Sequence, residues 1–146
     1  MKTRFALTLT LVGAVLFSLA LSAPQRSGGG DTKLGQYMGT LQQSLRELGK
    51  AMGEDAPDFE AAIAEVCRLQ TTCIQAKNEM PAKVAAMDNE KKKAKAAIGF
   101  RLQMHELIRG LLDVEAALLG HKAKQASKAI RALNKTKGKG HGKYKD

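Results

Sequence analysis

Residues 33–52, KLGQYMGTLQQSLRELGKAM, carry the pattern that decides the fold. Apolar side chains recur along this segment in alternating steps of four and three residues, at Leu34, Met38, Leu41, Leu45, Leu48 and Met52. An average step of about 3.5 residues places these side chains on one stripe of a helix that packs against partner helices. We therefore predict an amphipathic helix over residues 32–52.

Three further helices follow, separated by residues that interrupt helices. They are predicted over residues 57–80, from a start within 83–92 to residue 119, and from residue 121 onward. Pro57 suits a first helical turn, Pro81 ends a helix before it, and Gly120 is a natural helix stop. No segment shows a strand pattern. Four helices joined by short turns favour an all-α fold, an antiparallel up-down-up-down four-helix bundle.

The end of the last helix contains an unusual concentration of glycine. Gly138, Gly140 and Gly142 lie within five residues and surround His141. Each interior glycine costs about 1 kcal/mol of helix stability relative to alanine. We therefore expect this end of the helix to fray.

The N-terminal segment has the features of an export signal. Lys2 and Arg4 precede an uncharged apolar run over residues 5–21, which is followed by small residues before Ala23. This order is typical of a secretory signal peptide over residues 1–22. The alternative is a retained membrane anchor, for which a run of about 17 residues lies at the short limit.

Cleavage would leave a flexible linker over 23–31 and a bundle over 32–146. We expect a periplasmic protein with no stable membrane insertion after signal cleavage.

The positive charge of the chain is concentrated at its C-terminal end. The formal net charge is +10, yet residues 23–120 contain equal numbers of basic and acidic groups. Residues 121–146 contain nine Lys and Arg residues against a single acidic residue, Asp146. Such a segment attracts anionic partners through long-range fields. The segment has no motif typical of proteins that hydrogen-bond to the bases of nucleic acids, and export also argues against nucleic acid as the partner.

The two cysteines, Cys67 and Cys73, lie six residues apart on one predicted helix. Six residues of helix rise by about 9 Å, whereas a disulfide requires Cα atoms within about 7 Å. We therefore predict no bridge between them, so that both are reduced or bonded to another chain. The chain has no CxxCH motif, which excludes the usual covalent attachment of haem c.

Met38 and His141 are candidate metal ligands. In an up-down-up-down bundle, the start of the first helix and the end of the last lie at the same end. A thioether and an imidazole that face each other there can ligate an iron from two sides. By pattern alone, however, Met38 is an ordinary core residue and His141 belongs to a solvated tail. His105 and His121 are interpreted as surface or helix-cap residues.

Several segments resemble the soluble cytochrome b562 family. Residues 37–41, Tyr-Met-Gly-Thr-Leu, are similar to the first helix of that family, and residues 141–145 resemble its closing His-x-Lys-Tyr motif. Residues 77–83 resemble the exit of its second helix, and Phe100-Arg101 resembles the Phe-Arg pair of its third. The resemblance covers residues 33–146. The family is a standard example of the up-down-up-down topology, so the shared topology is not independent evidence.

The resemblance implies a site and a function. Met38 and His141 fall on the axial haem ligands, and Phe100 falls on an aromatic residue that packs on the haem. Met104 stands where the family has a second Phe, which leaves this wall of the cofactor-binding site altered but apolar. The implied protein binds haem b noncovalently, carries single electrons and is not an enzyme. We expect acidic redox partner proteins and a monomer or weak dimer.

Two other interpretations stay open. In the first, the chain is a haem-free relative, an exported four-helix-bundle protein in which Met38 is only a core residue. In the second, Lys135 to Lys145 bind anionic partners such as lipid headgroups or polysaccharide. The glycines around His141 depart from the family pattern, because ordering a frayed ligand opposes haem binding.

Overall fold

Each of the first three long helices begins at a polar side chain that caps it. The computed structural model describes residues 32–144. The side chains of Thr32, Asp58 and Asn89 accept hydrogen bonds from backbone N–H groups three residues further on, at 3.1, 2.9 and 2.9 Å. Such caps satisfy N–H groups that have no partner inside the helix. The helices are α1 (Lys33–Ala51), α2 (Phe59–Ala76), α3 (Ala82–Ala85), α4 (Glu90–Leu119) and α5 (Ala123–Tyr144).

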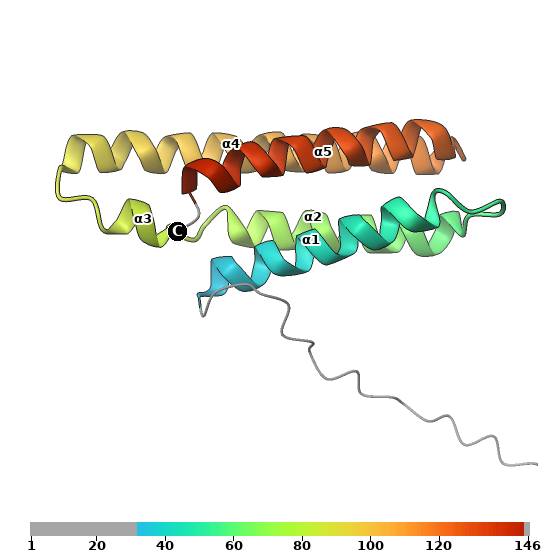
Figure 1. Ribbon diagram of the computed structural model, residues 1–146, viewed down its shortest axis with the longest axis horizontal. Coiled ribbons are helices and arrows are strands. Elements are labelled where there is room, and N and C mark those ends of the chain that lie inside the picture. Colours follow the sequence, from blue (N-terminus) through green and yellow to red (C-terminus); the bar gives the residue numbers. More distant parts are fainter. Residues whose placement is uncertain (1–31, 145–146) are drawn as a thin grey trace, which may run out of the picture.

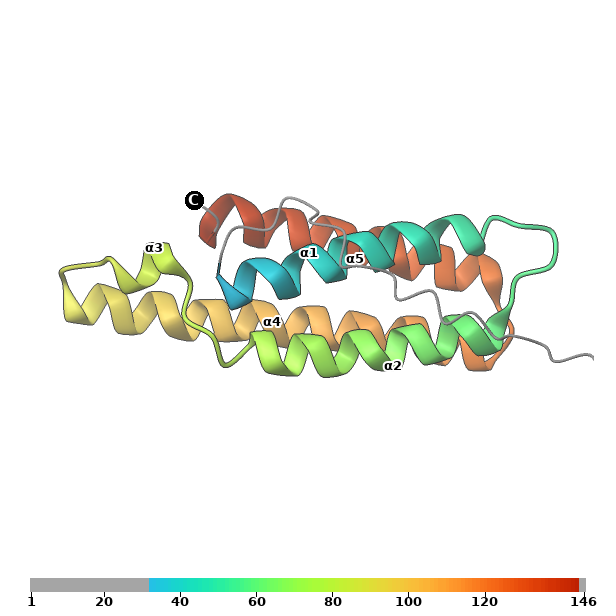
Figure 2. The same ribbon diagram turned by 90° about the horizontal axis from the view of Figure 1, so that it is seen from below.

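The four long helices form an antiparallel bundle (Figure 1). α2 runs back along α1, and α5 runs back along α4. α4 packs against both α2 and α5, while α1 packs against α2 and α5. The start of α1 and the end of α5 consequently lie at the same end of the molecule (Figure 2). The predicted all-α four-helix bundle is confirmed. The predicted signal peptide and linker, residues 1–22 and 23–31, lie outside the described residues.

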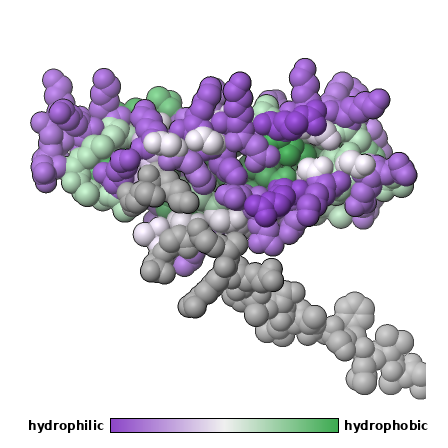
Figure 3. Space-filling view, viewed as in Figure 1, coloured by the Kyte–Doolittle hydropathy of each residue, from purple (hydrophilic) through white to green (hydrophobic). Residues whose placement is uncertain are grey.

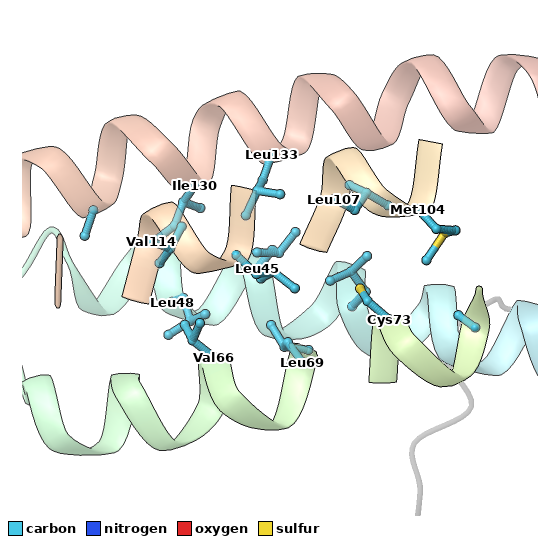
Figure 4. Packing of buried hydrophobic residues seen from close by; sticks show 14 of the residues in the cluster. Leu45, Leu48, Val66, Leu69, Cys73, Met104, Leu107, Val114, Ile130 and Leu133 are labelled. Carbon is cyan, nitrogen blue, oxygen red and sulfur yellow. The ribbon is translucent and has the colours of Figure 1, made fainter. Parts of the chain in front are cut away.

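The core occupies the middle of the bundle, where all four long helices contribute aliphatic side chains (Figure 4). On α1 the predicted stripe is buried from Leu41 onward, whereas Leu34 and Met38 are only partly buried against the core. Burial of this apolar area supplies the main stabilisation of the fold. The best-buried large side chains are Leu41, Leu45, Val66, Leu69, Met104, Leu107, Leu111, Val114, Leu118 and Leu133.

The segment around Pro81 differs from the prediction. α2 ends at Ala76 rather than at residue 80, and Met80 is 49 % exposed. Pro81 disfavours a helical conformation in the residue before it, and here Pro81 is itself buried and precedes the short helix α3. α3 packs against α4 and α5 and places the buried Val84 in the core (Figure 2).

Apolar periodicity in residues 90–119 predicts a core face that contains Ile98, Met104, Leu111 and Leu118, with Phe100, Leu107 and Leu112 at its border. The structure buries most of these residues, but the side chains of Ile98 and Leu112 are 61 % and 50 % exposed. Ile98 and Leu112 lie on a second, exposed apolar stripe of the helix, whereas the buried stripe comprises Phe100, Met104, Leu107, Leu111, Val114, Ala117 and Leu118.

Despite its three glycines, the end of α5 continues as a helix to Tyr144, and fraying of this end stays a prediction. Packing against α4 outweighs the low helix propensity of glycine. The Gln103 side chain of α4 donates a hydrogen bond to the backbone oxygen of Thr136 at 3.2 Å. The backbone at Gly140 lies close to the same side chain, since a Cβ there would be 3.2 Å from Gln103 Cγ. The buried Tyr144 then fixes the final turn.

The cysteine prediction is confirmed. α2 is continuous through Cys67 and Cys73, and both are free thiols. Over residues 32–144, no helix is long and apolar enough to cross a membrane.

Candidate functional site

Met38 and His141 lie at the same level of the bundle. The antiparallel register of α1 and α5 is set where Gly49 lies against Ile130, since a Cβ on Gly49 would be 3.8 Å from Ile130 Cγ2. Met38 is eleven residues before Gly49, and His141 is eleven residues after Ile130. Eleven residues make about three helical turns and about 16 Å of rise. Met38 therefore lies on the same side of α1 as Gly49, and His141 lies on the same side of α5 as Ile130. Because the helices are antiparallel, both residues are displaced in the same direction along the bundle. By this count Met38 and His141 fall at about the same level of α1 and α5, which lie further apart toward this end of the bundle (Figure 1).

Both residues are half-buried. Met38 follows the same stripe as Leu41 and Leu45, which are fully buried, but it lies nearer the end of the bundle and packs against the edge of the core. His141 lies on the last turn of α5. Met38 thus packs at the edge of the core, as the interpretation of a core residue expects, and His141 belongs to a helix rather than to a solvated tail.

Phe100 and Met104 line the same end of the bundle from α4. Both are buried, and they lie one helical turn apart. The ring of Phe100 contacts the ring of Tyr144, and Gly140 approaches Gln103, so this part of α4 lies alongside the last two turns of α5. The four predicted site residues thus come from α1, α4 and α5 and lie toward the same end of the bundle.

Tyr144 is a residue of this end that the sequence prediction did not include in the site. Its hydroxyl is buried and has no hydrogen-bond partner among the described residues. Gly99 provides the room for it, since a Cβ at Gly99 would be 2.7 Å from Tyr144 Oη. A buried hydroxyl without a partner is costly, and the few such groups in folded proteins often lie at functional sites. The sequence signal was an aromatic residue three positions after His141, on the same side of the helix.

The charge near this end is positive. The ammonium group of Lys143 lies 5.2 Å from the centre of the Tyr144 ring, within the range of a cation–π contact. Lys137, one turn before His141, is half-buried, and both its burial and the nearby charge of Arg46 lower the pKa of its ammonium group. Anionic groups are therefore favoured at this end of α5.

The other two histidines lie away from this cluster. His105 is exposed on α4. His121 occupies the turn between α4 and α5 with a φ of 52°, and its ring lies 4.7 Å from the ring of Phe59. Both positions agree with the prediction of surface or cap residues.

A thioether and an imidazole with apolar walls suit a metal that is carried in a planar organic group. Within residues 32–144, no three His, Cys, Asp or Glu side chains gather as a bare metal ion would require.

Comparison with known proteins adds one match. The family described as Cytochrome b562 matches residues 33–145 of this chain. No curated protein and no solved structure matches it.

Proposed function

Because the chain belongs to the cytochrome b562 family, we propose that it is a periplasmic electron carrier that holds one noncovalent haem b between Met38 and His141. The family is one of haem-binding electron carriers rather than of enzymes. The observation that supports the proposed ligation is the Gly49–Ile130 contact between α1 and α5, from which Met38 and His141 fall at about the same level, at the end where α1 begins and α5 ends.

The residues present fit a haem. A thioether sulfur and a neutral imidazole nitrogen are an established pair of axial ligands, and they come here from neighbouring helices. Phe100 and Met104 supply buried apolar surface for a porphyrin face. The Tyr144 hydroxyl supplies a buried donor that has no partner within the described residues. The positive charge of Lys143 and its neighbours suits carboxylate groups such as the propionates of haem.

Haem supplies an iron that changes its oxidation state by one electron. The protein side chains determine how readily that happens. The neutral sulfur of Met38 favours the ferrous state and raises the reduction potential relative to a second histidine. The buried side chains of Phe100 and Met104 would exclude water from a bound haem, which would also favour the state of lower charge. The two donors would come from the helices α1 and α5.

The basic residues of α5 support the proposal of an acidic redox partner. Lys128, Lys135, Lys139 and Lys143 are exposed along this helix. A positively charged surface accelerates the encounter with a negatively charged partner, and salt weakens this attraction. Reduction of the protein by an acidic partner should therefore slow as ionic strength rises.

The test is a titration of the mature protein with haem, followed by absorption spectra in the oxidised and reduced states. We expect saturation at one haem per chain and a low-spin six-coordinate spectrum. Met38→Ala and His141→Ala should each give a high-spin spectrum or lose haem, whereas His105→Ala, an exposed residue of α4, should match the wild type. Equal spectra in all four proteins would exclude this pair of ligands. No saturable uptake by the wild type would instead favour the haem-free relative.

The rival proposal is anion binding by Lys135 to Lys145. Its test should remove charge without deleting the segment. Residues 135–144 belong to α5, and Tyr144 is part of the core. Deletion would therefore damage the bundle. Replacing Lys135, Lys139 and Lys143 by Gln removes charge from exposed positions only, and vesicle or polyanion pelleting then reports on binding.

A further inference from the structure

A groove runs between α1 and α5, about two to four helical turns from the level of Met38 and His141. Its volume is about 240 Å³. The seam between the two helices lies on the face seen in Figure 3, where strongly hydrophilic residues flank a small apolar area. The lining residues come equally from the two helices and are Leu45, Arg46, Gly49, Lys50, Ser127, Ile130, Arg131 and Asn134.

Positive charge stands on both walls of this groove. Arg46 and Lys50 belong to α1, and Arg131 belongs to α5. None of the residues that line the groove is an Asp or a Glu. The ion pairs found over residues 32–144 each join neighbours within α2 or within α4, so the cations of the groove take part in none of them.

Lys137 adds a fourth cation beside the groove. It lies on α5 close enough to Arg46 for the two charges to repel, and this repulsion is one cause of its lowered pKa, after burial. Like charges at this distance oppose the packing of α1 against α5. The bundle holds them together because Leu45 and Ile130 are buried beneath them. The fold thus maintains a cluster of cations that a bound anion would stabilise.

The groove also offers neutral hydrogen-bond donors and space. Ser127 and Asn134 present a hydroxyl and an amide beside the cations. Gly49 has no side chain to fill the groove, and its Cα faces Ile130. Guanidinium groups bind oxyanions through paired hydrogen bonds, which are stronger when both partners are charged. A volume of about 240 Å³ admits a small ligand.

We propose that the α1–α5 groove is a binding site for a small multivalent oxyanion of phosphate chemistry, held by Arg46, Lys50 and Arg131 with Lys137 beside them. Such a ligand would bridge the two helices and neutralise their repulsion. The site is separate from the proposed haem site, and its occupancy does not depend on haem.

The test is isothermal titration calorimetry of the mature haem-free protein with inorganic pyrophosphate at about 0.1 M salt, where charges further apart than about 10 Å are screened. We expect one site per chain. The double variant Arg46→Gln with Arg131→Gln should bind at least about tenfold more weakly, because it loses two charge-assisted contacts. The matched control is Lys128→Gln with Lys139→Gln, which removes equal charge from exposed positions of α5 outside the groove. It should change the affinity less than about twofold.

Two results would overturn the proposal. Equal weakening in both double variants would mean that net charge alone attracts the anion. Absence of saturable binding by the wild type would exclude the site. A second arm uses vesicles that contain phosphatidylglycerol, since a lipid headgroup presents the same chemistry. Binding to vesicles but not to free pyrophosphate would assign this surface to a membrane and contradict a small free ligand.

The melting temperature of the groove variant serves as a control for misfolding. Because Arg46→Gln and Arg131→Gln relieve repulsion, the double variant should melt no earlier than the wild type when no anion is present. Added pyrophosphate should raise the melting temperature of the wild type, and the groove variant should lose this increase.

Discussion

The ring of Tyr144 meets the ring of Phe100 edge to face, with their centroids 5.4 Å apart and their planes at 77°. This contact joins the last turn of α5 to α4 at the same end of the bundle as Met38 and His141. Aromatic pairs in this geometry stabilise a fold beyond the area that they bury. Tyr144 thus anchors the helix that carries His141, and it does so although its hydroxyl is buried without a partner among residues 32–144.

Replacing Tyr144 by Phe should stabilise the haem-free protein. The change keeps the ring contact with Phe100 and removes a hydroxyl whose desolvation is not compensated. We expect the free energy of unfolding to rise by about 1 kcal/mol, measured by urea unfolding. Tyr37→Phe, at a half-buried position of α1, is the control and should bring no comparable gain. A less stable Tyr144→Phe protein would show that the hydroxyl has a partner in solution.

Replacing Gly138 or Gly142 by Ala should also stabilise the protein. A Cβ at either position would have no atom of the described residues within 4 Å beyond its own helix backbone and chain neighbours. Each change should therefore add about 0.5–1 kcal/mol of helix stability, checked by thermal and urea unfolding. Gly140→Ala is the contrasting variant, because its Cβ would press on Gln103 at 3.2 Å and disturb the hydrogen bond to Thr136. A gain at Gly140 as large as at Gly138 would contradict this account.

The acid sensitivity of the fold should depend on Glu65. Burial tends to raise the pKa of its carboxyl, but the hydrogen bonds from Arg68 and Ser44 outweigh burial and lower the pKa below the ordinary 4.5. Arg68 donates from two nitrogens at 2.8 and 2.6 Å, and it also donates to the buried Ser44 at 2.9 Å. The resulting stabilisation is complete above about pH 4.5, the unfolded value, and is lost as the pH falls through the folded pKa.

Glu65→Gln should therefore lower the melting temperature near pH 7 and have a smaller effect near pH 3. Melting temperatures from pH 7 to pH 3 measure this difference. In an Arg68→Gln background the effect of Glu65→Gln should shrink at neutral pH, since the ion pair is already absent. An unchanged difference between the two backgrounds would mean that Glu65 acts through other contacts.

The two cysteines should react at very different rates. Burial raises the pKa of the Cys73 thiol to about 12, and its side chain is 1 % exposed. Cys67 is exposed, although desolvation and the Glu115 carboxylate, which accepts a hydrogen bond from its thiol, raise its pKa as well. A thiol reagent should label one cysteine per folded chain, faster as the pH rises, and two in urea. Cys67→Ser should abolish labelling of the folded protein, and residual rapid labelling would show that the core opens around Cys73.

The bundle could be predicted from sequence because periodicity, caps and helix stops agree along most of the chain. Periodicity predicts Met104, Leu111 and Leu118 on the buried face of α4, but it cannot separate them from Ile98 and Leu112, which lie on a second apolar stripe of the same helix. The four residues of α3 are too few to show a period at all. The low helix propensity of glycine did not indicate that α5 continues to Tyr144. Propensity is a local property, whereas the contact of Gly140 with Gln103 joins two helices.

The candidate site could be predicted in part. The topology alone brings Met38 and His141 to one end of the bundle, and the register at Gly49 and Ile130 refines this to the same level. Tyr144 was not predicted as a site residue, because its burial depends on Gly99, a residue of another helix with no local signal.

The glycines near His141 also have a consequence for the speed of ligand exchange. They lower the cost of opening the last turns of α5, so that these turns can unwind while the core around Leu45 and Leu133 stays folded. A bulky flat ligand could then enter and leave through a brief local opening, without passage through the unfolded chain. Amide hydrogens near residue 140 should accordingly exchange with solvent far sooner than those near residue 130. The time that a ligand stays bound would be set by the motion of one helix end, independently of how stable the whole bundle is.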